Sequence, residues 1–301
     1  MCEIGFGIDG GGTHSRLCLF RLEDGQEIGR FTGGSTNMYS VGRDEAMRNT
    51  ERLLRSSGVS LERLKAGCLG SAGLSRPAEK EAFSAFFRRL LPQCSMYLCN
   101  DGETLLVGAL EATEGYCLIA GTGSLALARD GEGHIARAGG LGYMLGDEGS
   151  ALWIAWQAIR RAMRSREGRD LETSLLPDLV KHFSLSCPED FVALLHHHFE
   201  KAVIATAAGL VLDRAQDDPL AADIARAAIN ELVQLLGSVM RQMPLSPPCA
   251  ALAGGVMEHN AWFRSRLIDR LALDYPGLKV VLGPGDAVRG ACMLARTAWR
   301  T

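Results

Sequence analysis

The sequence predicts an α/β protein built from two similar domains with a cleft between them. A glycine turn flanked by two apolar runs occurs twice in the chain, which favours a duplicated unit. Apolar runs of strand length also alternate with stretches of helical periodicity, the pattern of a mainly parallel sheet covered by helices. The length of 301 residues agrees with two domains, and we place them at residues 1–114 and 115–301.

The first glycine turn lies almost at the start of the chain. An apolar run ends at Asp9, the chain turns through Gly10-Gly11-Gly12-Thr13, and a second apolar run follows. Glycines leave the backbone N–H groups bare at the tip of such a hairpin, and bare amides suit a polyphosphate. Asp9 lies where a phosphate-bound Mg²⁺ would be, since hard cations prefer carboxylate and water oxygens.

The second glycine turn repeats the first. It reads Gly121-Thr122-Gly123-Ser124 between apolar runs, and aligning Ile8 with Ile119 places glycine on glycine. The position of Asp9 is then taken by Ala120, and two hairpins that face one nucleotide need only one metal-bound acid. Beyond the hairpins an Asp-Gly turn follows in both copies, at residues 24–25 and 130–131.

The remaining elements are expected in alternating order. In the first half we expect a strand at 27–31, a helix at 43–56, a strand at 64–69, a helix at 77–91, a strand at 95–99 and a helix at 103–110. In the second half we expect a helix at 148–166, a strand at 249–253, a helix at 260–273, a strand at 279–282 and a helix at 286–299. Residues 166–219 have no counterpart in the first half. This order predicts a mainly parallel sheet that begins with an antiparallel meander.

The composition is that expected of a soluble cytoplasmic enzyme. The formal net charge of −3 gives no sign of the basic surface that nucleic-acid binding needs. No apolar run approaches the roughly 20 residues of a membrane span, and the direct entry into a strand leaves no room for a secretory signal. The nine cysteines lie mostly inside apolar runs, so we expect buried free thiols in a reducing compartment.

Two acids are candidates for a site. Asp101 follows the strand at 95–99, and ligands collect at the carboxyl ends of parallel strands. Asp147 lies in the glycine-rich stretch 139–150 before a long helix, which favours a ligand-binding loop. Each acid also has a plainer interpretation as the N-cap of the helix that follows it.

Taken together, the motifs resemble the N-acetylglucosamine kinases of the BadF/BadG-type ATPase family, sugar kinases of the actin-like ATPase superfamily. The matches are Asp9 to Thr13, Ser35-Thr36-Asn37, Asn100-Asp101, Gly121 to Ser124, Gly140 to Ser150 and Ala253-Gly254-Gly255-Val256. The resemblance implies two ribonuclease-H-like domains that flank an ATP cleft, with the last helix packing back on the first domain. It also implies a homodimer.

The resemblance assigns roles to individual residues. It implies that Asp101 is the catalytic base for the 6-OH of the sugar and that Asp9 holds Mg²⁺ through water. The implied ATP-binding residues are Gly10, Gly11, Gly12, Thr13, Gly121, Thr122, Gly123, Ser124, Gly254 and Gly255. The implied sugar-binding residues are Asn37, Tyr39, Asp101, Thr122, Gly140 and Asp147.

The chain departs from the family pattern beside the sugar site. Tyr39 and Leu141 stand where the vertebrate-type enzymes have Trp, which leaves the substituent at C2 of the sugar open. N-acetylglucosamine is the expected substrate, and glucosamine or another hexosamine is the alternative. A more remote alternative is an ATPase that activates a 2-hydroxyacyl-CoA dehydratase, whose iron–sulfur cluster would need cysteines such as Cys94 and Cys99. A sugar sensor without activity would tolerate loss of Asp9 or Asp101, and both are present.

Overall fold

The apolar runs around the first glycine turn form two buried antiparallel strands. In the computed structural model, which describes residues 2–282 and 285–300, β1 (Ile4–Gly10) pairs with β2 (His14–Arg21), and β2 pairs with β3 (Glu27–Gly34). Ile4, Phe6 and Ile8 are at most 3% exposed because β1 is central in its sheet. β4 (Leu64–Ser71) pairs with β1 in parallel, and β5 (Ser95–Cys99) pairs with β4 in parallel. The sheet therefore begins as the predicted meander and continues in parallel.

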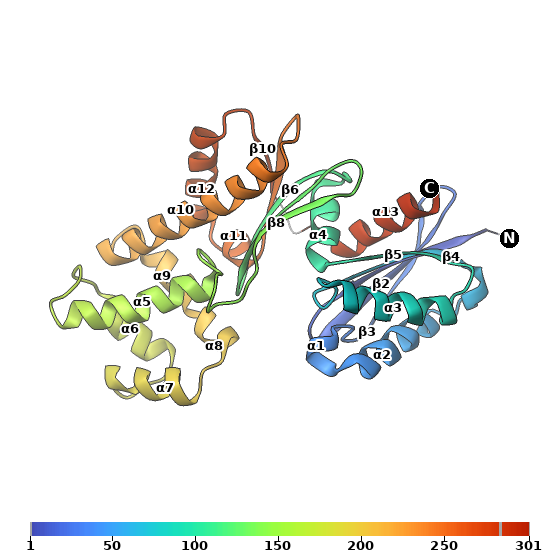
Figure 1. Cartoon of the computed structure of the whole chain (residues 1–301). Helices are drawn as coiled ribbons and strands as arrows, with labels where there is room; N and C mark the ends of the chain where they lie inside the picture. The colour runs from blue at the N-terminus through green and yellow to red at the C-terminus, as the bar shows by residue number, and fades with distance from the viewer. Residues whose placement is uncertain (1, 283–284, 301) are drawn as a thin grey trace. The chain divides into compact units, whose positions relative to one another are not determined.

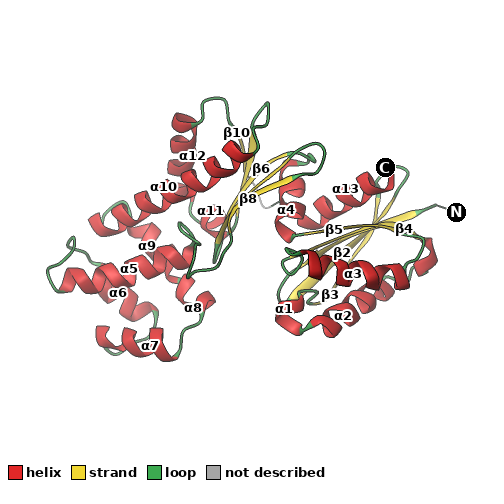
Figure 2. Cartoon of the chain, viewed as in Figure 1, coloured by secondary structure: helices red, strands yellow, loops and turns green. Residues whose placement is uncertain are grey.

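The chain divides into two compact units (Figure 1). Residues 2–115, 129–134 and 285–300 group into the first unit, and residues 116–128 and 135–282 group into the second. Each unit is built on one five-stranded mixed sheet, in the orders β3-β2-β1-β4-β5 and β10-β9-β6-β7-β8 (Figure 2). The predicted α/β class is confirmed.

Helices cover both faces of the sheet in the first unit (Figure 1). Phe6 of β1 packs against Phe87, with ring centroids 6.4 Å apart, in an apolar cluster under two of these helices. The other face is covered by the fourth helix of the chain and by the last one, which packs on β1 and β4. The helices of this unit are α1 (Met38–Val41), α2 (Arg43–Ser56), a 3-10 turn (Leu61–Arg63), α3 (Pro77–Leu90), α4 (Asp101–Leu110) and α13 (Ala287–Arg300).

The last helix, α13, lies so close to its neighbours that glycine is required at the contacts. A Cβ on Gly7 of β1 would lie 2.6 Å from the backbone nitrogen of Cys292. A Cβ on Gly290 would lie 1.9 Å from the carbonyl oxygen of Thr104 in α4. The C-terminal segment is thus an integral layer of the first unit.

The sheet of the second unit packs on a large helical core. Its strands are β6 (Gly115–Ala120), β7 (Ser124–Arg129), β8 (Ile135–Gly139), β9 (Cys249–Ala253) and β10 (Lys279–Leu282). Its helices are α5 (Ala151–Arg166), α6 (Leu175–His182), a 3-10 turn (Pro188–Asp190), α7 (Phe191–His197), α8 (Lys201–Ala205), α9 (Ala207–Arg214), α10 (Pro219–Gln242), α11 (Gly255–His259) and α12 (Ala261–Asp274). The segment 166–219, which the sequence left without a counterpart, forms the helices α6 to α9.

The predicted first residues of two helices were wrong, because other residues than the predicted ones cap these helices. Ser150 accepts the Trp153 N–H at 3.2 Å, so α5 begins at Ala151 and not at residue 148. Asn100 caps α4, which therefore begins at Asp101 and not at residue 103.

Among the described residues, no helix is both long enough and apolar enough to cross a membrane.

Candidate active site

The first glycine turn is tight, and the segment after β3 packs against it. The Gly11 N–H donates to the His14 carbonyl at 3.0 Å, and the hydroxyl of Ser35 donates to the Gly11 carbonyl at 2.9 Å. A Cβ on Gly10 would lie 2.0 Å from Oγ1 of Thr36, which is fully buried. The segment after β3 therefore fixes the loop, while the exposed Gly12 faces solvent.

An arginine that the sequence analysis did not single out contacts Asp9. The guanidinium of Arg16 donates to Asp9 Oδ2 at 2.7 Å, and the Asp9 side chain is 15% exposed. The pair forms because Asp9 and Arg16 face each other in the β1–β2 register. The hairpin register alone could have identified Arg16, because it places this residue opposite Asp9. An arginine beside a phosphate loop can also bind anionic ligands.

Asp101 and Asp9 lie at the same edge of the first sheet. Asp9 pairs with Gly70 of β4, and Gly70 pairs with Cys99, the last residue of β5. Since β4 separates the two strands and neighbouring strands are about 4.8 Å apart, their ends lie about 10 Å apart. The two acids therefore belong to strand ends that are separated by one strand.

Asn100 and Glu103, rather than Asp101, close the start of α4. The side-chain oxygen of Asn100 accepts the Gly102 N–H at 2.9 Å, and Glu103 Oε1 accepts the Asn100 N–H at 3.4 Å. Burial raises the pKa of Glu103, whose Oε2 also accepts the Tyr97 hydroxyl at 3.2 Å. The N-cap interpretation of Asp101 is wrong, because that role belongs to Asn100.

Two further predicted sugar-binding residues lie near this edge of the first unit. Asn37 caps α1 by accepting the Tyr39 N–H at 2.9 Å, and a Cβ on Gly73 would lie 2.9 Å from Asn37 Oδ1. Asn37 therefore contacts the loop after β4. β4 is the neighbour of β5, the strand that Asp101 follows. Tyr39 is 64% exposed, and its hydroxyl donates to Glu79 Oε1 at 2.5 Å.

The second glycine turn is closed by backbone bonds of its own in the second unit. The Gly121 N–H donates to the Gly123 carbonyl at 2.9 Å, and the Ala151 N–H donates to the Gly121 carbonyl at 2.8 Å. Gly254 has a φ of +97°, and a Cβ there would lie 2.5 Å from the Ala120 carbonyl oxygen. Only glycine fits this crossing of the two segments.

Asp147 joins the glycine-rich loop 139–150 to the second hairpin. Its Oδ1 accepts the Ser124 N–H at 3.1 Å, and the Gly140 N–H donates to the Ser124 carbonyl at 2.9 Å. Asp147 is 9% exposed and has a φ of +65°. The N-cap interpretation of Asp147 is wrong as well, because Ser150 caps α5.

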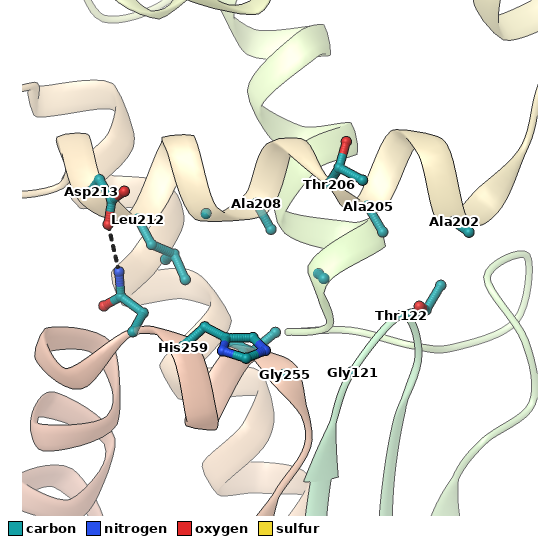
Figure 3. Close-up of a pocket in the computed structure, with 14 residues that line it drawn as sticks. Gly121, Thr122, Ala202, Ala205, Thr206, Ala208, Leu212, Asp213, Gly255 and His259 are labelled. Atoms are coloured by element: carbon teal, nitrogen blue, oxygen red, sulfur yellow. Dashed lines mark hydrogen bonds between the residues drawn. The ribbon is translucent and has the colours of Figure 1, made fainter. Parts of the chain in front are cut away.

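A cavity of about 580 Å³ adjoins this hairpin within the second unit (Figure 3). Helices α8 and α9 form one wall, and α11 with the hairpin forms the opposite wall. Its lining residues are Gly121, Thr122, Ala151, Ala202, Ala205, Thr206, Ala208, Gly209, Leu212, Asp213, Gly255, Val256, His259 and Asn260. Three predicted ATP-binding residues, Gly121, Thr122 and Gly255, thus line one cavity.

The α8–α9 wall is the part of the site that the sequence analysis missed. Its cavity-facing residues are nearly all small, among them Ala202, Ala205, Ala208 and Gly209. Such a stripe leaves room for a flat ligand, but a run of alanines is equally typical of any buried helix face. His259 and Asn260 were also missed, although they lie four and five residues after Gly255 of the predicted motif.

The donor set around Asp9 fits a magnesium ion that arrives with its ligand. In the described part of the chain, no group of three His, Cys, Asp or Glu side chains gathers to hold a metal. Mg²⁺ in nucleotide enzymes usually needs one or two carboxylates and completes its shell with phosphate oxygens and water. Asp9 at the base of a bare-amide loop can supply such a carboxylate.

The cysteines do not suit an iron–sulfur cluster. All nine cysteines are free thiols, and Cys99 lies fully buried in β5. Burial raises the pKa of Cys94 to about 12 and that of Cys99 well above its usual value, whereas cluster ligands are thiolates.

Comparison with known proteins identifies relatives along nearly the whole chain. The model of the BadF/BadG/BcrA/BcrD ATPase family matches residues 6–295. An N-acetylmuramic acid/N-acetylglucosamine kinase from Clostridium acetobutylicum is 30% identical over 299 residues, which cover 97% of each chain. A glucosamine kinase from Vibrio cholerae is 30% identical over 183 residues, 59% of this chain and 60% of the relative.

A solved structure shows the same fold. The crystal structure of a candidate N-acetylglucosamine kinase from Chromobacterium violaceum superposes with a TM-score of 0.73 at 26% identity, covering 98% of this chain and 99% of that one. The chain therefore has the actin-like ATPase fold that the resemblance implied.

Proposed function

Because the chain belongs to the BadF/BadG/BcrA/BcrD ATPase family, we propose that it is an ATP-dependent amino-sugar kinase that phosphorylates the 6-OH of N-acetylglucosamine. The observation that carries the proposal is the shared sheet edge of the first unit, where a bare-amide loop and Asp9 end β1 and Asp101 follows the end of β5, two strands away. The full-length relative from Clostridium, a kinase of N-acetylated amino sugars, supports the choice of substrate.

Asp101 is the base in this proposal. Its carboxylate orients the sugar hydroxyl and accepts the proton as the hydroxyl oxygen forms a bond to the γ-phosphorus and the bond to the β-phosphate oxygen breaks. Phosphoryl transfer needs mainly positioning and charge neutralisation, so one oriented carboxylate and backbone amides contribute most of what the protein must supply. Mg²⁺ bound near Asp9 would neutralise phosphate charge.

Each glycine hairpin is a phosphate-binding loop in this proposal, formed by Gly10, Gly11, Gly12 and Thr13 in the first unit and by Gly121, Thr122, Gly123 and Ser124 in the second. The cavity beside Gly254 and Gly255 takes the adenosine, since it adjoins the second hairpin and has a largely apolar wall of small side chains.

The proposed sugar-binding residues are Asn37, Tyr39 and Asp101 of the first unit and Thr122, Gly140 and Asp147 of the second. Glucosamine is the second candidate substrate, favoured by the relative from Vibrio cholerae. The identity of the group at C2 depends on Tyr39 and Leu141, which are 64% and 66% exposed. A homodimer remains part of this proposal.

The test is an ADP-release assay with Mg²⁺, ATP and a panel of sugars. The panel contains N-acetylglucosamine, N-acetylmuramic acid, glucosamine, N-acetylmannosamine and glucose, with a blank that lacks sugar. Strong stimulation by an amino sugar is expected, and NMR of the product locates the phosphate on O6. ATP hydrolysis that is indifferent to every sugar would overturn the proposal.

A pair of variants tests the base. Asp101→Asn is expected to keep the fold and the ATP affinity while kcat falls by roughly two to four orders of magnitude, because a positioned base is lost. Asp44→Asn, the same change at an exposed position of α2, is the matched control and should leave kcat unchanged. Turnover of Asp101→Asn near that of the wild type would remove Asp101 from the mechanism.

A further inference from the structure

The cavity of the second unit has a direction, from the hairpin at one end to an acid at the other. Figure 3 shows Thr122 of the hairpin beside Ala202 at the start of α8, whereas Asp213 lies at the far end of α9. Ala202 and Asp213 are eleven positions apart. At 1.5 Å per residue, a helical wall of that length spans about 16 Å.

The proposed function sets the order of the nucleotide along this wall. Phosphates bind where the backbone amides are bare, which is the hairpin end. The ribose follows beside the small residues in the middle of the wall, and the base reaches the end opposite the hairpin. A side chain at Asp213 is therefore placed to contact the base.

A buried amide holds the Asp213 carboxylate in place. The Asn260 side chain donates through Nδ2 to Asp213 Oδ1 at 3.0 Å (Figure 3), while its own Oδ1 accepts the Phe263 N–H at 2.8 Å as the cap of α12. Asn260 is 8% exposed, so both bonds fix its orientation. Its carbonyl oxygen is committed to the helix, which leaves the NH₂ group for Asp213.

Asp213 is a carboxylate without a cationic partner in the described chain. None of the ion pairs within residues 2–282 and 285–300 includes it, and the adjacent Arg214 pairs with Asp178 instead. An ionised carboxylate only accepts hydrogen bonds. Asp213 is exposed, and the bond from Asn260 engages one of its two oxygens. This end of the cavity therefore presents an acceptor that a donor on a ligand can meet.

We propose that Asp213 accepts a hydrogen bond from the exocyclic 6-amino group of adenine and thereby selects ATP over triphosphates with a 6-oxo purine. The inference rests on the proposed function, which brings the nucleotide to this cavity. Adenine carries an N–H donor at position 6, whereas hypoxanthine and guanine carry a carbonyl oxygen there. Two acceptors would then face each other, and such a mismatch rejects the wrong ligand. Asp213 acts as a specificity residue and takes no part in the chemistry.

Nucleotide binding to the full chain, measured by calorimetry without sugar, tests this role. The wild type is expected to bind ATP roughly 10- to 100-fold more tightly than ITP, the usual range for one hydrogen bond to a charged group. In Asp213→Asn an amide NH₂ can donate to the 6-oxo group. The ratio should therefore fall to within a few-fold of unity, with ITP binding more tightly than to the wild type. This gain cannot result from misfolding.

Controls separate the alternatives. Asp217→Asn makes the same change at an exposed position four residues on and outside the cavity lining, and it should keep the wild-type ratio. A ratio unchanged in Asp213→Asn, or a change that appears only between ATP and dATP, would overturn the proposal, the latter because it indicates a ribose contact. If the wild type binds ATP and Asp213→Asn keeps the ratio, this inference fails alone. If the wild type binds no adenine nucleotide, the proposed function fails with it.

Discussion

The two glycine hairpins repeat one sequence pattern, but their carboxylates have different partners. In the first hairpin, Asp9 is the last but one residue of β1 and pairs with the exposed guanidinium of Arg16. In the second, Ala120 stands at that position, and the acid Asp147 comes from a distant loop to accept the Ser124 N–H. The first loop is supported instead by the hydroxyls of Ser35 and Thr36.

The difference shows that one glycine pattern can be stabilised by different chemistry. Hydroxyl groups behind the first hairpin leave its carboxylate available to a cation, whether Arg16 or a metal. In the second hairpin the carboxylate is a structural acceptor for a backbone amide, and charge-assisted bonds of this kind are among the stronger hydrogen bonds. The two copies of the glycine turn therefore differ in what their acid does: Asp9 contacts a cation, and Asp147 holds the backbone of the loop.

Among changes in and beyond the two hairpins, removing the acid of the first hairpin should have the largest effect. Asp9→Ala is expected to lower kcat/KM by about 100-fold and to raise the Mg²⁺ concentration needed for half-maximal rate, because charge stabilisation at the phosphates is lost. Magnesium titrations of the kinase rate measure both quantities. Asp24→Ala, at an exposed acid of the β2–β3 turn, is the control. An unchanged metal dependence in Asp9→Ala would show that the first loop was assigned wrongly.

Adding one methyl group at equivalent glycines should separate the two hairpins by stability. A Cβ on Gly10 meets the buried Thr36 Oγ1 at 2.0 Å, whereas a Cβ on Gly121 meets nothing within 4 Å. We expect Gly10→Ala to lower the free energy of unfolding by about 1–3 kcal/mol through overpacking. Gly121→Ala should stay within about 0.5 kcal/mol of the wild type. Urea denaturation of both variants provides the comparison, which equal losses would contradict.

The Asp-Gly turns beyond the hairpins should differ in their response to pH, and this effect is the smallest. Asp24 pairs with Arg21, which stays charged, but Asp130 bonds His134 Nδ1 at 2.9 Å. The hydrogen bond that His134 donates to the Asp130 carboxylate raises the pKa of His134 above its usual value near 6.5. Since the folded pKa is raised, the stabilisation is fully present below the unfolded pKa and is lost as the pH rises through the folded one.

An NMR titration of the histidine ring protons checks this prediction. The His134 resonance should titrate above pH 6.5, and Asp130→Asn should return it toward the usual value. In thermal unfolding, the stability of the wild type relative to His134→Gln should be higher at pH 6 than at pH 8. A His134 resonance that titrates below 6.5 would contradict the bond seen here.

Much of the architecture follows from local patterns in the sequence. The glycine turns, the alternation of strands and helices and the meander at the start of the chain were all predictable, because buried strands read as apolar runs that end at glycine. The placement of Asp101 after β5 was also predictable, because the parallel arrangement brings strand ends to one edge.

The sequence was less informative where a function depends on contacts between distant segments. Arg16 matters because the strand register places it opposite Asp9. Asp147 matters because it accepts the Ser124 N–H. Local periodicity connects neither pair of residues. The helix caps were misplaced because Asn100 and Ser150 compete with nearby acids for the same role. The α8–α9 wall escaped notice because small residues on a helix look alike whether they face a core or a cavity.

The close packing of α13 on the first unit has a consequence for biosynthesis. A ribosome delivers the chain from its N-terminus, and domains generally fold as they emerge. Here β1 lacks one of its covering layers until residues 287–300 have been made, after the whole second unit. The second unit can be complete first, so the nascent first sheet must wait with one apolar face covered by α4 alone. It is during this interval that we expect chaperones to bind.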